Sequence, residues 1–576
     1  MKPGSLGLVF SEELLESSGE TKAAFSSVRL RFIWVAFLFC FSLLFLRLVW
    51  LQIIQGPRNR VLSDENRILV RRIQAPRGVI TDRNGEVLAQ NVPIYKVKNP
   101  DCAEHPGDEG IEKTQASGCR EYVEISREDA LKLEATGGGG DVLTIIGRRY
   151  VYGPEIAQVV GFVGEADTQE LAQHPDYTLG DLIGKAGVEL KYEEYLHGTN
   201  GAELVEIDAD AAVVREISKN DPLDGGDLKL NIDATLQKKG YELLGDRVGA
   251  LVALDPRNGQ VLTLVSRPSF DPTNVSLSLA GEDQPFFNRS IAGVYPPGSV
   301  FKVVTATAGL EDGKVTATTE IEDTGEIRIG PYRYGNWYFD QYGRKEGSLD
   351  IVHAIKRSND IFFYRVGEAV GATVLSEWAK AFGFGRFSGI DLPGEADGLV
   401  PSPLWKEQMR GERWFLGNTY HFAIGQSDLA VTPLQVTQMT GVAATGKLCR
   451  PHVIDRPEDN GSFCEDPGIH EETLRLVRAG MVEACLPGGT AFPFFNFGVG
   501  TGEGFRRIEV GCKTGTAEFG DPKGRTHAWF TAYAPKENPE IVVTVLLEGA
   551  GEGSYEAAPV AKGFLEEYFL QNTENK

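Results

Sequence analysis

One long apolar run stands out in the pattern of hydrophobic and polar positions near the start of the chain. Residues 32–54 are apolar apart from Ser42, Arg47 and Gln52. As a helix this run reaches about 34 Å, enough to cross the hydrocarbon core of a bilayer. No small-residue cleavage site follows it, so we predict an uncleaved transmembrane anchor over residues 32–54 rather than a signal peptide. Residues 1–31 are then expected to form a cytoplasmic tail.

Short strands are predicted after the anchor. Asp82–Gly85 is typical of a hairpin turn, with strands expected over residues 78–81 and 86–89. Residues 99–140 show no regular pattern and are expected to be irregular. A further strand-rich piece leads to the boundary of a large C-terminal domain, which we place between residues 222 and 228.

Helical and strand patterns alternate through the rest of the chain. Helices are predicted at residues 184–198, 235–244, 349–356, 361–368 and 559–570. Strands are predicted at residues 228–232, 249–254, 260–266, 509–518, 527–534 and 541–547. Because helices lie between strands from the two ends of the C-terminal domain, the pattern indicates an α/β arrangement with an antiparallel sheet.

Length and charge narrow the class of protein. A chain of 576 residues is too long for one core, and ordinary domain sizes predict about three or four domains. The formal net charge of −23 argues against nucleic acid or an anionic lipid surface as a broad partner, because both would repel the chain. The charge does not argue against a small neutral or cationic substrate.

The cysteines indicate a redox compartment. Cys40 lies in the apolar run. The other six are Cys102, Cys119, Cys449, Cys464, Cys485 and Cys512. Cys102 with Cys119 and Cys449 with Cys464 are spaced as local bridges, which would put most of the chain in an oxidising compartment. Reduced, buried thiols are the alternative. No Cys-x-x-Cys or His-x-x-x-His spacing accompanies these cysteines, so we predict no metal there.

The candidate chemistry begins at Ser299 and Lys302. A helix starting near Gly298 would stack both side chains on one face, one turn apart. A serine is a poor nucleophile until a base takes its proton, and a lysine serves as that base only if burial or a second cation lowers its pKa. Ser-x-x-Lys alone is common by chance and would carry little weight.

Two later stretches change that assessment. Ser358-Asn359-Asp360 precedes an aromatic run, and Lys513-Thr514-Gly515 lies in a predicted strand. The order Ser-x-x-Lys, Ser-x-Asp, Lys-Thr-Gly is the joint mark of active-site serine β-lactamases and penicillin-binding proteins. Without the flanking motifs, a helix cap would be the better reading of Ser358 and Asp360.

The chain resembles the class B penicillin-binding proteins, in particular the elongation-type group known as the penicillin-binding protein 2 group. Besides the three motifs, the resemblance includes Pro76–Gly85, Gly184, Lys185, Gly187, Glu189, Tyr295–Gly298 and Ile424–Gln426. It implies a multidomain α/β protein with a membrane helix, a β-rich elongated pedestal or dimerisation-type domain (55–225) and a penicillin-binding transpeptidase domain (226–572).

The resemblance also implies roles. Ser299 is expected to attack the penultimate D-alanine carbonyl of a stem peptide, with Lys302 as general base, helped by Lys513. Ser358 would relay a proton to the leaving amine, and Asp360 would hold Ser358 and Lys302 in place.

Substrate binding is assigned to the Lys-Thr-Gly strand. Thr514 and Thr516 would offer hydroxyls to the substrate carboxylate, and Gly515 would leave room for close approach. The backbone N–H groups of Ser299 and Thr516 would form the oxyanion hole.

The resemblance further implies function, partners and location. We expect a D,D-transpeptidase that cross-links stem peptides ending in D-Ala-D-Ala during cell-wall elongation and is acylated by β-lactams. A SEDS-type glycosyltransferase and other elongation-complex membrane proteins are the expected partners. The chain would be single-pass in the inner membrane with its bulk periplasmic. No cofactor is expected, and residues 336–345 lack the histidine that a zinc site of some relatives would need.

Two other functions use the same motifs. A D,D-carboxypeptidase or β-lactamase would resolve the acyl-enzyme with water rather than an amine, and a β-lactam sensor or scaffold would not turn over. The anchor and the large piece before residue 228 favour the transpeptidase.

Overall fold

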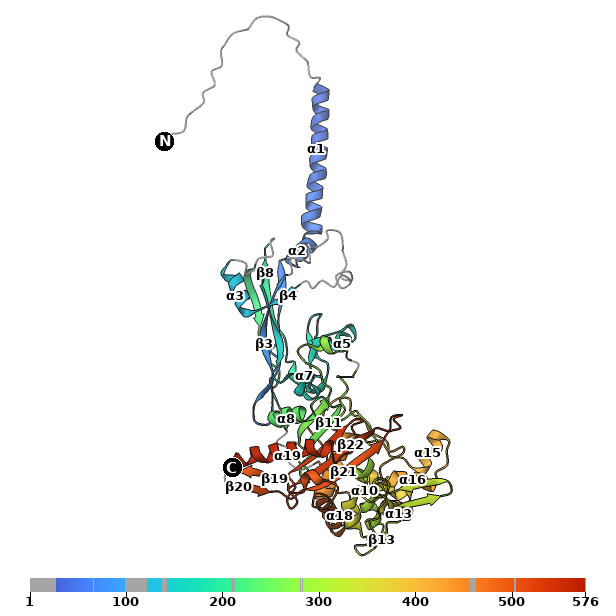
Figure 1. Cartoon of the computed structure of the whole chain (residues 1–576). Coiled ribbons are helices and arrows are strands. Elements are labelled where there is room, and N and C mark those ends of the chain that lie inside the picture. Colours follow the sequence, from blue (N-terminus) through green and yellow to red (C-terminus); the bar gives the residue numbers. More distant parts are fainter. Residues whose placement is uncertain are drawn as a thin grey trace. The chain divides into compact units, whose positions relative to one another are not determined.

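The structure is a computed structural model (Figure 1), which describes residues 27–65, 67–98, 122–136, 142–208, 213–279, 281, 283–455, 463–501 and 504–574. Its contacts divide the chain into two units. Unit 1 is Met1–Ile73 with Gly201–Asp221, and unit 2 is Gln74–Asn200 with Pro222–Lys576. Unit 2 includes residues on both sides of the expected border between residues 225 and 226, so that border stays a prediction.

Unit 1 carries the predicted anchor. Its elements are α1 (Ser27–Val49), the π-helix η1 (Trp50–Ile54), α2 (Gly56–Glu65), β1 (Ile68–Ile73), β8 (Gly201–Ile207) and β9 (Val213–Asn220). Among the described residues, one helical stretch, Arg31–Ile54, is long and apolar enough to cross a membrane. The strands form an antiparallel sheet in the order β1-β8-β9. Most of the expected cytoplasmic tail lies outside the described residues.

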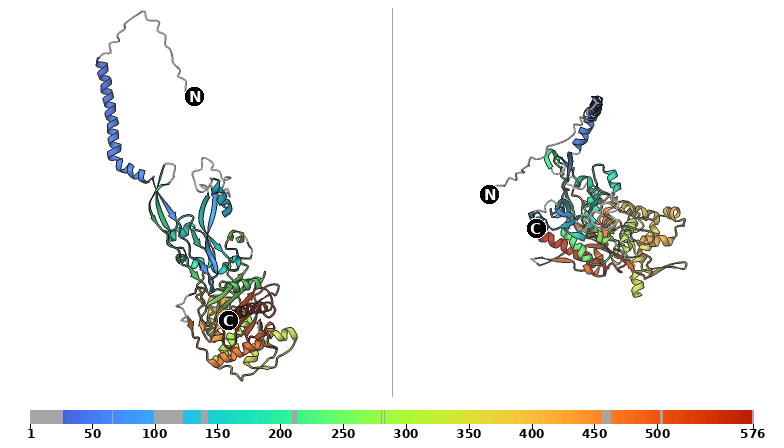
Figure 2. Two further views of the ribbon diagram at one scale, coloured as in Figure 1. Left: turned by 90° about the vertical axis from the view of Figure 1, so that its left-hand side faces the viewer. Right: turned by 90° about the horizontal axis from the view of Figure 1, so that it is seen from above.

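A second sheet opens unit 2. It has the strand order β10-β2-β3-β4, with β5 also on β3. Its strands are β2 (Ile80–Thr81), β3 (Val87–Lys98), β4 (Tyr122–Ile125), β5 (Val142–Tyr150) and β10 (Leu228–Lys229). The long strands β3 and β5 run antiparallel side by side (Figure 2). The hairpin across Asp82–Gly85 is confirmed by the antiparallel pair β2 and β3.

Shorter elements accompany this sheet. They are α3 (Arg127–Ala135), η4 (Gly153–Glu155), α4 (Ala157–Val160), β6 (Val163–Glu165), α5 (Thr168–Gln173), β7 (Leu182–Gly184), α6 (Gly187–Lys191) and α7 (Glu193–Leu196). Two sequence predictions were wrong here. Residues 122–135 are regular, because β4 pairs with β3 and Ser126 caps α3. The single helix expected over 184–198 starts only at Gly187, after strand β7, and is broken at Tyr192, whose backbone leaves the helical region. Cys102 and Cys119 lie outside the described residues.

Four buried charges cross-link this part of unit 2. Arg77 pairs with Glu189 at 2.6 Å and Glu193 at 2.6 Å, and Arg148 reaches the other Glu189 oxygen at 2.7 Å. Burial alone would lower the pKa of Arg77, but the two carboxylates outweigh it and raise that pKa. Burial would raise the pKa of Glu193, but Arg77 lowers it below the ordinary value. We call Arg77, Arg148, Glu189 and Glu193 the guanidinium cluster.

A five-stranded antiparallel sheet organises the rest of unit 2 in the order β12-β11-β23-β22-β21. Its strands are β11 (Gly249–Leu254), β12 (Val261–Arg267), β21 (Gly511–Glu518), β22 (Thr526–Ala534) and β23 (Ile541–Leu547). Helices α8 (Ala234–Leu244) and α19 (Ala557–Glu574) pack on one face (Figure 1). Helices α17 (Pro433–Thr445), α18 (Glu471–Ala484) and α10 (Lys302–Glu311) belong to the core on the other side. The predicted α/β domain with an antiparallel sheet is confirmed.

The remaining elements follow the chain between β12 and β21. They are α9 (Val275–Ser278), η5 (Gly298–Phe301), β13 (Ile321–Glu322), β14 (Glu326–Ile329), β15 (Tyr332–Gly335), α11 (Trp337–Tyr342), β16 (Ser348–Leu349), α12 (Ile351–Arg357), α13 (Asp360–Val370), α14 (Ala372–Ala381), α15 (Pro403–Arg410), α16 (Leu416–Ala423), β17 (Leu448–Cys449), β18 (Cys464–Glu465), η7 (Phe492–Phe494), β19 (Gly498–Thr501) and β20 (Gly504–Arg507).

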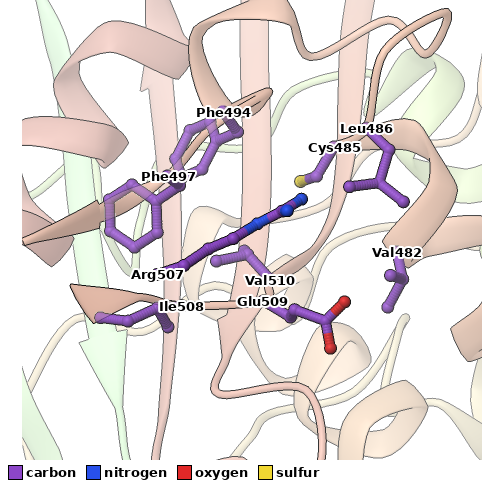
Figure 3. Close-up of a pocket in the computed structure, with 9 residues that line it drawn as sticks. All are labelled: Val482, Cys485, Leu486, Phe494, Phe497, Arg507, Ile508, Glu509 and Val510. Carbon is purple, nitrogen blue, oxygen red and sulfur yellow. The ribbon is translucent and has the colours of Figure 1, made fainter. Parts of the chain in front are cut away.

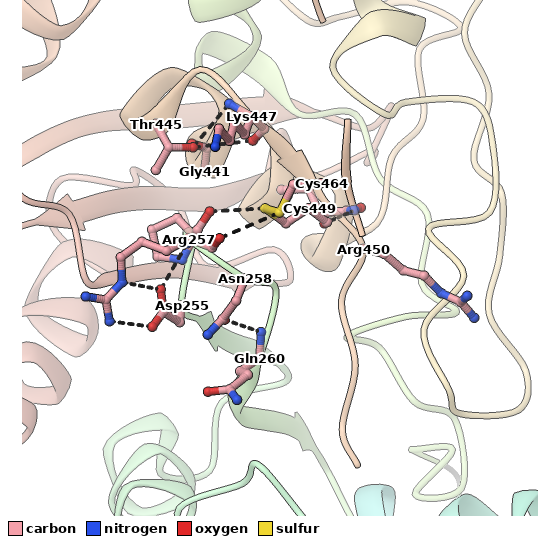
Figure 4. Close-up of a disulfide and its surroundings, with 12 residues drawn as sticks. Asp255, Arg257, Asn258, Gln260, Gly441, Thr445, Lys447, Cys449, Arg450 and Cys464 are labelled. Atoms are coloured by element: carbon pink, nitrogen blue, oxygen red, sulfur yellow. Dashed lines mark hydrogen bonds and ion pairs between the residues drawn. A yellow bond between two sulfur atoms is a disulfide. The ribbon is translucent and has the colours of Figure 1, made fainter. Parts of the chain in front are cut away.

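Two disulfides lie among the described residues of unit 2. The predicted Cys449–Cys464 bridge joins β17 to β18, and its sulfurs approach the carbonyl oxygens of Pro256 at 3.4 Å and Arg257 at 3.6 Å (Figure 4). A second bridge, Cys485–Cys512, was not predicted. It links the residue after α18 to strand β21, directly before Lys513.

Candidate active site

Ser299 lies in a tight turn that starts against strand β21. Gly298 has φ +56°, and a Cβ added there would lie 2.6 Å from the carbonyl oxygen of Thr516. Its N–H donates to the carbonyl of Gly425 at 2.8 Å. The turn η5 is a 3₁₀ helix that continues as α10 from Lys302, so the predicted helix start near Gly298 is confirmed. Ser299 is half-buried, whereas Lys302 is fully buried.

Ser358 and Asp360 lie where α12 passes into α13. Ser358 ends α12 with φ 53° and ψ 38°, in the left-handed region. Asn359 caps α13 by accepting from the N–H of Phe362 at 2.9 Å. The cap is therefore Asn359, which leaves the side chains of Ser358 and Asp360 for other contacts.

The two lysines meet at the Ser358 hydroxyl. Lys302 Nζ donates to Asp360 Oδ1 at 2.6 Å, to the Ser358 carbonyl at 2.7 Å and to Ser358 Oγ at 3.2 Å. Lys513 Nζ donates to the same Oγ at 2.8 Å and to the carbonyl of Thr514 at 2.9 Å. We call Lys302, Ser358, Asp360 and Lys513 the lysine cluster. Motifs distant in sequence thus share one hydroxyl.

Burial governs the charges of this cluster. Both lysines are 0% exposed, and desolvation lowers the pKa of Lys302, although Asp360 opposes the shift. The pKa of Lys513 lies well below its ordinary value, because desolvation is joined by the positive charge of Lys302. Within the described residues, no carboxylate forms an ion pair with Lys513, whereas Asp360 pairs with Lys302 at 2.6 Å. Two buried amines with one carboxylate form a site prepared to accept a proton.

Strand β21 supplies the third motif at an edge of the sheet. It pairs with β22. The Gln426 amide meets its other edge at Glu518; with the amide oriented to satisfy both groups, its nitrogen donates to the Glu518 carbonyl at 3.3 Å and its oxygen accepts from the Glu518 N–H at 3.2 Å. Thr516 is exposed. Thr514 is buried and donates its hydroxyl to Thr490 at 2.8 Å.

Gly515 is required by packing against η5. A Cβ there would lie 2.9 Å from Trp529 Cβ, 3.0 Å from Val300 Cγ1 and 3.1 Å from the carbonyl of Pro297. The glycine thus lets η5 approach β21, a reason different from the predicted room for substrate.

The Ser299 hydroxyl stands apart from this hydrogen-bond network. Among the described residues, no hydrogen bond joins it to Lys302, Ser358 or Lys513. Its position is set by the backbone of η5, one turn before Lys302 and next to Thr516. The predicted site residues are thus brought to one place, with the lysine cluster bonded internally and Ser299 beside it.

Some residues that support the site have no signal in the sequence. Asp360 Oδ2 accepts from the N–H of Trp337 at 2.9 Å, and the N–H of Asp360 donates to Asn336 at 3.1 Å. Thr490 lies in the segment closed by the Cys485–Cys512 bridge. None of these three belongs to a spaced motif, so only contacts in the fold reveal them.

Two pockets lie away from the predicted residues. One adjoins Cys485 between α18, η7 and the strand β20 (Figure 3), and the other is lined by Arg77 and Arg148 of the guanidinium cluster. Within the described residues, no three His, Cys, Asp or Glu side chains gather as a metal site would need. The expectation of no metal remains a prediction.

Comparison with known families matches two parts of the chain. The model described as penicillin binding protein transpeptidase domain matches residues 249–566, and the model described as penicillin-binding protein dimerisation domain matches residues 123–230. The first match contains every predicted site residue.

Similar proteins cover most of the chain. The peptidoglycan D,D-transpeptidase MrdA of Acinetobacter baumannii is 32% identical over 93% of this chain and 86% of its own length. The MrdA protein of Escherichia coli is 30% identical over 87% of this chain and 88% of its own length. A Helicobacter pylori complex between penicillin-binding protein PBP2 and MreC gives a TM-score of 0.74 at 27% identity, covering 87% and 99%. The structure of Pseudomonas aeruginosa PBP2 in complex with WCK 5153 gives a TM-score of 0.67 at 31% identity, and the match covers 87% of this chain and 96% of that one.

Proposed function

Because the chain belongs to the penicillin-binding protein transpeptidases, we propose that it is a peptidoglycan D,D-transpeptidase of cell-wall elongation and a target of β-lactams, with Ser299 as its nucleophile. The similarity to proteins named peptidoglycan D,D-transpeptidase MrdA, at 30–32% identity over most of the chain, supports this function.

The observation that carries the assignment of residues is the shared hydroxyl of Ser358. Two fully buried amines donate to it, and a fold that only needed stability would not bury two like charges against one carboxylate. Such groups with perturbed pKa values are typical of reactive sites.

The geometry supports an acylation in which a proton moves three times: from Ser299 to Lys302, from Lys302 to Ser358, and from Ser358 to the leaving nitrogen. Ser299 Oγ attacks the carbonyl of the penultimate D-alanine while its proton passes to the amine of Lys302. The proton then moves through Ser358 to the nitrogen of the terminal D-alanine as the C–N bond breaks. The products are free D-alanine and an ester on Ser299, which the amine of a second stem peptide resolves. Burial and the charge of Lys302 lower the pKa of Lys513, which donates to Ser358 Oγ and so stands beside the proposed proton path.

The edge of β21 is the proposed site for the peptide. A substrate strand added there would form backbone hydrogen bonds, with Thr516, which is exposed, nearest its carboxylate. Thr514 would act with it, exchanging its bond to Thr490. The N–H groups of Ser299 and Thr516 are proposed as the oxyanion hole, since η5 and β21 meet at Gly298.

The chain fits a single-pass membrane protein, because one apolar helix long enough to span a membrane, Arg31–Ile54, is found where the structure describes the chain, ahead of the large C-terminal part. We propose the inner membrane, with the bulk of the chain periplasmic; the disulfides support an oxidising compartment. Membrane partners of the elongation complex, including a SEDS-type glycosyltransferase, are proposed from relatives solved with MreC and in a peptidoglycan synthase complex.

Product analysis tests this function. The full-length chain in detergent, with lipid-linked peptidoglycan and a polymerase, is expected to give cross-linked dimers by mass spectrometry, and Ser299→Ala is expected to give none. Tetrapeptides without dimers would mean a D,D-carboxypeptidase. Rapid turnover of bound penicillin would mean a β-lactamase, and stable labelling without products a sensor.

A further inference from the structure

The backbone of Ser358 is held in an unfavourable conformation. Its φ of 53° and ψ of 38° lie in the left-handed region, which non-glycine residues enter at an energetic cost. Such a residue keeps its conformation only when the surrounding structure fixes it. The contacts on either side of Ser358 therefore decide where its hydroxyl stands between the two lysines.

One carboxylate holds both neighbours of Ser358. Glu346 Oε1 accepts from Arg357 Nε, and Glu346 Oε2 accepts from Asn359 Nδ2 at 2.9 Å. The Glu346 side chain is 6% exposed, and Asn359 is fully buried. The residues immediately before and after Ser358 are thus tied to the same side chain.

We call Glu346, Arg357 and Asn359 the clamp. Further hydrogen bonds hold Glu346 and Arg357 in place. The N–H of Glu346 donates to Asp323 at 2.9 Å. The carbonyl of Arg357 accepts from Trp337 Nε1 at 3.0 Å, and Arg357 Nη1 donates to the carbonyl of Gly488 at 2.7 Å. Glu346 is therefore held by a backbone hydrogen bond to Asp323. Arg357 is held by Glu346, by Trp337 and by the carbonyl of Gly488.

We propose that Glu346 is a positioning residue for the transfer reaction, which sets the conformation of Ser358 and so the place of the hydroxyl shared by Lys302 and Lys513. The inference rests on the proposed function, in which Ser358 passes the proton. Glu346 acts through Arg357 and Asn359, and within the described residues no hydrogen bond of its carboxylate reaches a reacting group of the proposed mechanism. Its charge also raises the pKa of Lys302, an effect that does not need the Ser358 hydroxyl.

A neighbouring ion pair provides the matched control. Lys356, at the same end of α12, pairs with Glu483 of α18 at 2.9 Å. This pair resembles the Arg357 pair in chemistry and location but contacts neither neighbour of Ser358. Glu483→Gln therefore tests the loss of a salt bridge without the loss of the clamp.

The test compares acylation rates of full-length variants in detergent. Glutamine at 346 keeps one acceptor oxygen, so it can hold one of the two donors. Glu346→Gln is expected to lower the second-order rate of labelling by fluorescent penicillin by about 10- to 100-fold, as for loss of a charged hydrogen bond. Glu483→Gln is expected to label at the wild-type rate.

A double-mutant cycle separates positioning from general support. In a Ser358→Ala background, Glu346→Gln is expected to cause no further loss, because the hydroxyl that Glu346 positions is already gone. If Glu346→Gln fails to fold, Asn359→Ser replaces it, since serine keeps the cap of α13 but removes the donor to Glu346.

Three outcomes are decisive. An unchanged rate in Glu346→Gln, or the same fold-loss with and without the Ser358 hydroxyl, would overturn the positioning role while leaving the proposed function intact. Labelling that survives in Ser299→Ala would instead contradict the proposed nucleophile. Loss only when the hydroxyl is present supports the clamp.

Discussion

The guanidinium cluster and the lysine cluster are both buried in unit 2, and they differ in charge balance. The first sets two arginines against two glutamates, and the pKa of Arg77 is raised while that of Glu193 is lowered. The second sets two lysines against Asp360, and the pKa of both lysines is lowered. The balanced charges of the guanidinium cluster keep each group in its charged form. The unbalanced charges of the lysine cluster make it easier for a lysine to give up its proton.

This difference indicates that buried charges within unit 2 serve either stability or reaction, depending on their balance. In the guanidinium cluster every charged group gains from its partners, so losing one leaves a net charge in the interior. In the lysine cluster burial lowers the pKa of both lysines, and the positive charge of Lys302 lowers that of Lys513 further. Losing one lysine there leaves one cation for one anion. Removing a charge from the guanidinium cluster should therefore lower stability and leave activity unchanged. Removing a charge from the lysine cluster should lower activity and leave stability nearly unchanged.

The largest expected effect follows from removing Lys302. Lys302→Met is expected to reduce the rate of penicillin labelling by on the order of 10⁴-fold, as for loss of a member of a catalytic set. Its melting temperature should stay near the wild-type value, because the charges of Lys513 and Asp360 are opposite and still attract each other, although no hydrogen bond joins them within the described residues. A melting temperature lowered by many degrees would mean that the lysine cluster also supports the fold, and the contrast would fail.

The opposite result is expected in the guanidinium cluster. Arg77→Met should lower the free energy of unfolding by about 3–5 kcal/mol, because Glu193 loses its cation in the interior. The labelling rate per folded molecule should not change. Denaturant unfolding followed by labelling measures both. Arg475→Met is the control, since Arg475 pairs with Glu472 at the surface, where a pair contributes about 1 kcal/mol or less.

A smaller effect is a shift of the pH profile. Acylation needs a neutral amine, so its rate should rise with pH and level off once the lysine has lost its proton. Asp360 raises the pKa of Lys302, so Asp360→Asn should move the rise to lower pH, whatever it does to the maximal rate. Labelling rates between about pH 6 and 10 measure the shift. Glu193→Gln should leave the profile in place; a rise displaced to higher pH in Asp360→Asn would contradict the account.

Local patterns predicted the sheet because each strand is a short run of mostly apolar residues; β23, for example, is buried along its whole length. Strands β21, β22 and β23 and the junction before α13 appeared where expected. The helix over residues 184–198 failed because a break at Tyr192 leaves the apolar spacing intact. Periodicity reports a buried face but says little about where the backbone turns.

The site was predicted as far as its motifs extend. Ser358, Asp360 and Lys513 were found by spacing and order, but their meeting with Lys302 is a property of the fold. Glu346 had no signal, since a single glutamate in a polar stretch is usually solvated. The Cys485–Cys512 pair was missed because spacing favours short loops, whereas this bridge joins a helix end to a strand.

The Cys485–Cys512 bridge also bears on how the protein should be produced. Cys512 directly precedes Lys513 and is fully buried, so material made in a reducing cytosol would carry two thiols in the hydrophobic core beside the catalytic strand. Secretion into an oxidising compartment, and purification without dithiothreitol, would keep α18 covalently fastened to that strand. Preparations should be checked for free thiols before their rates are compared.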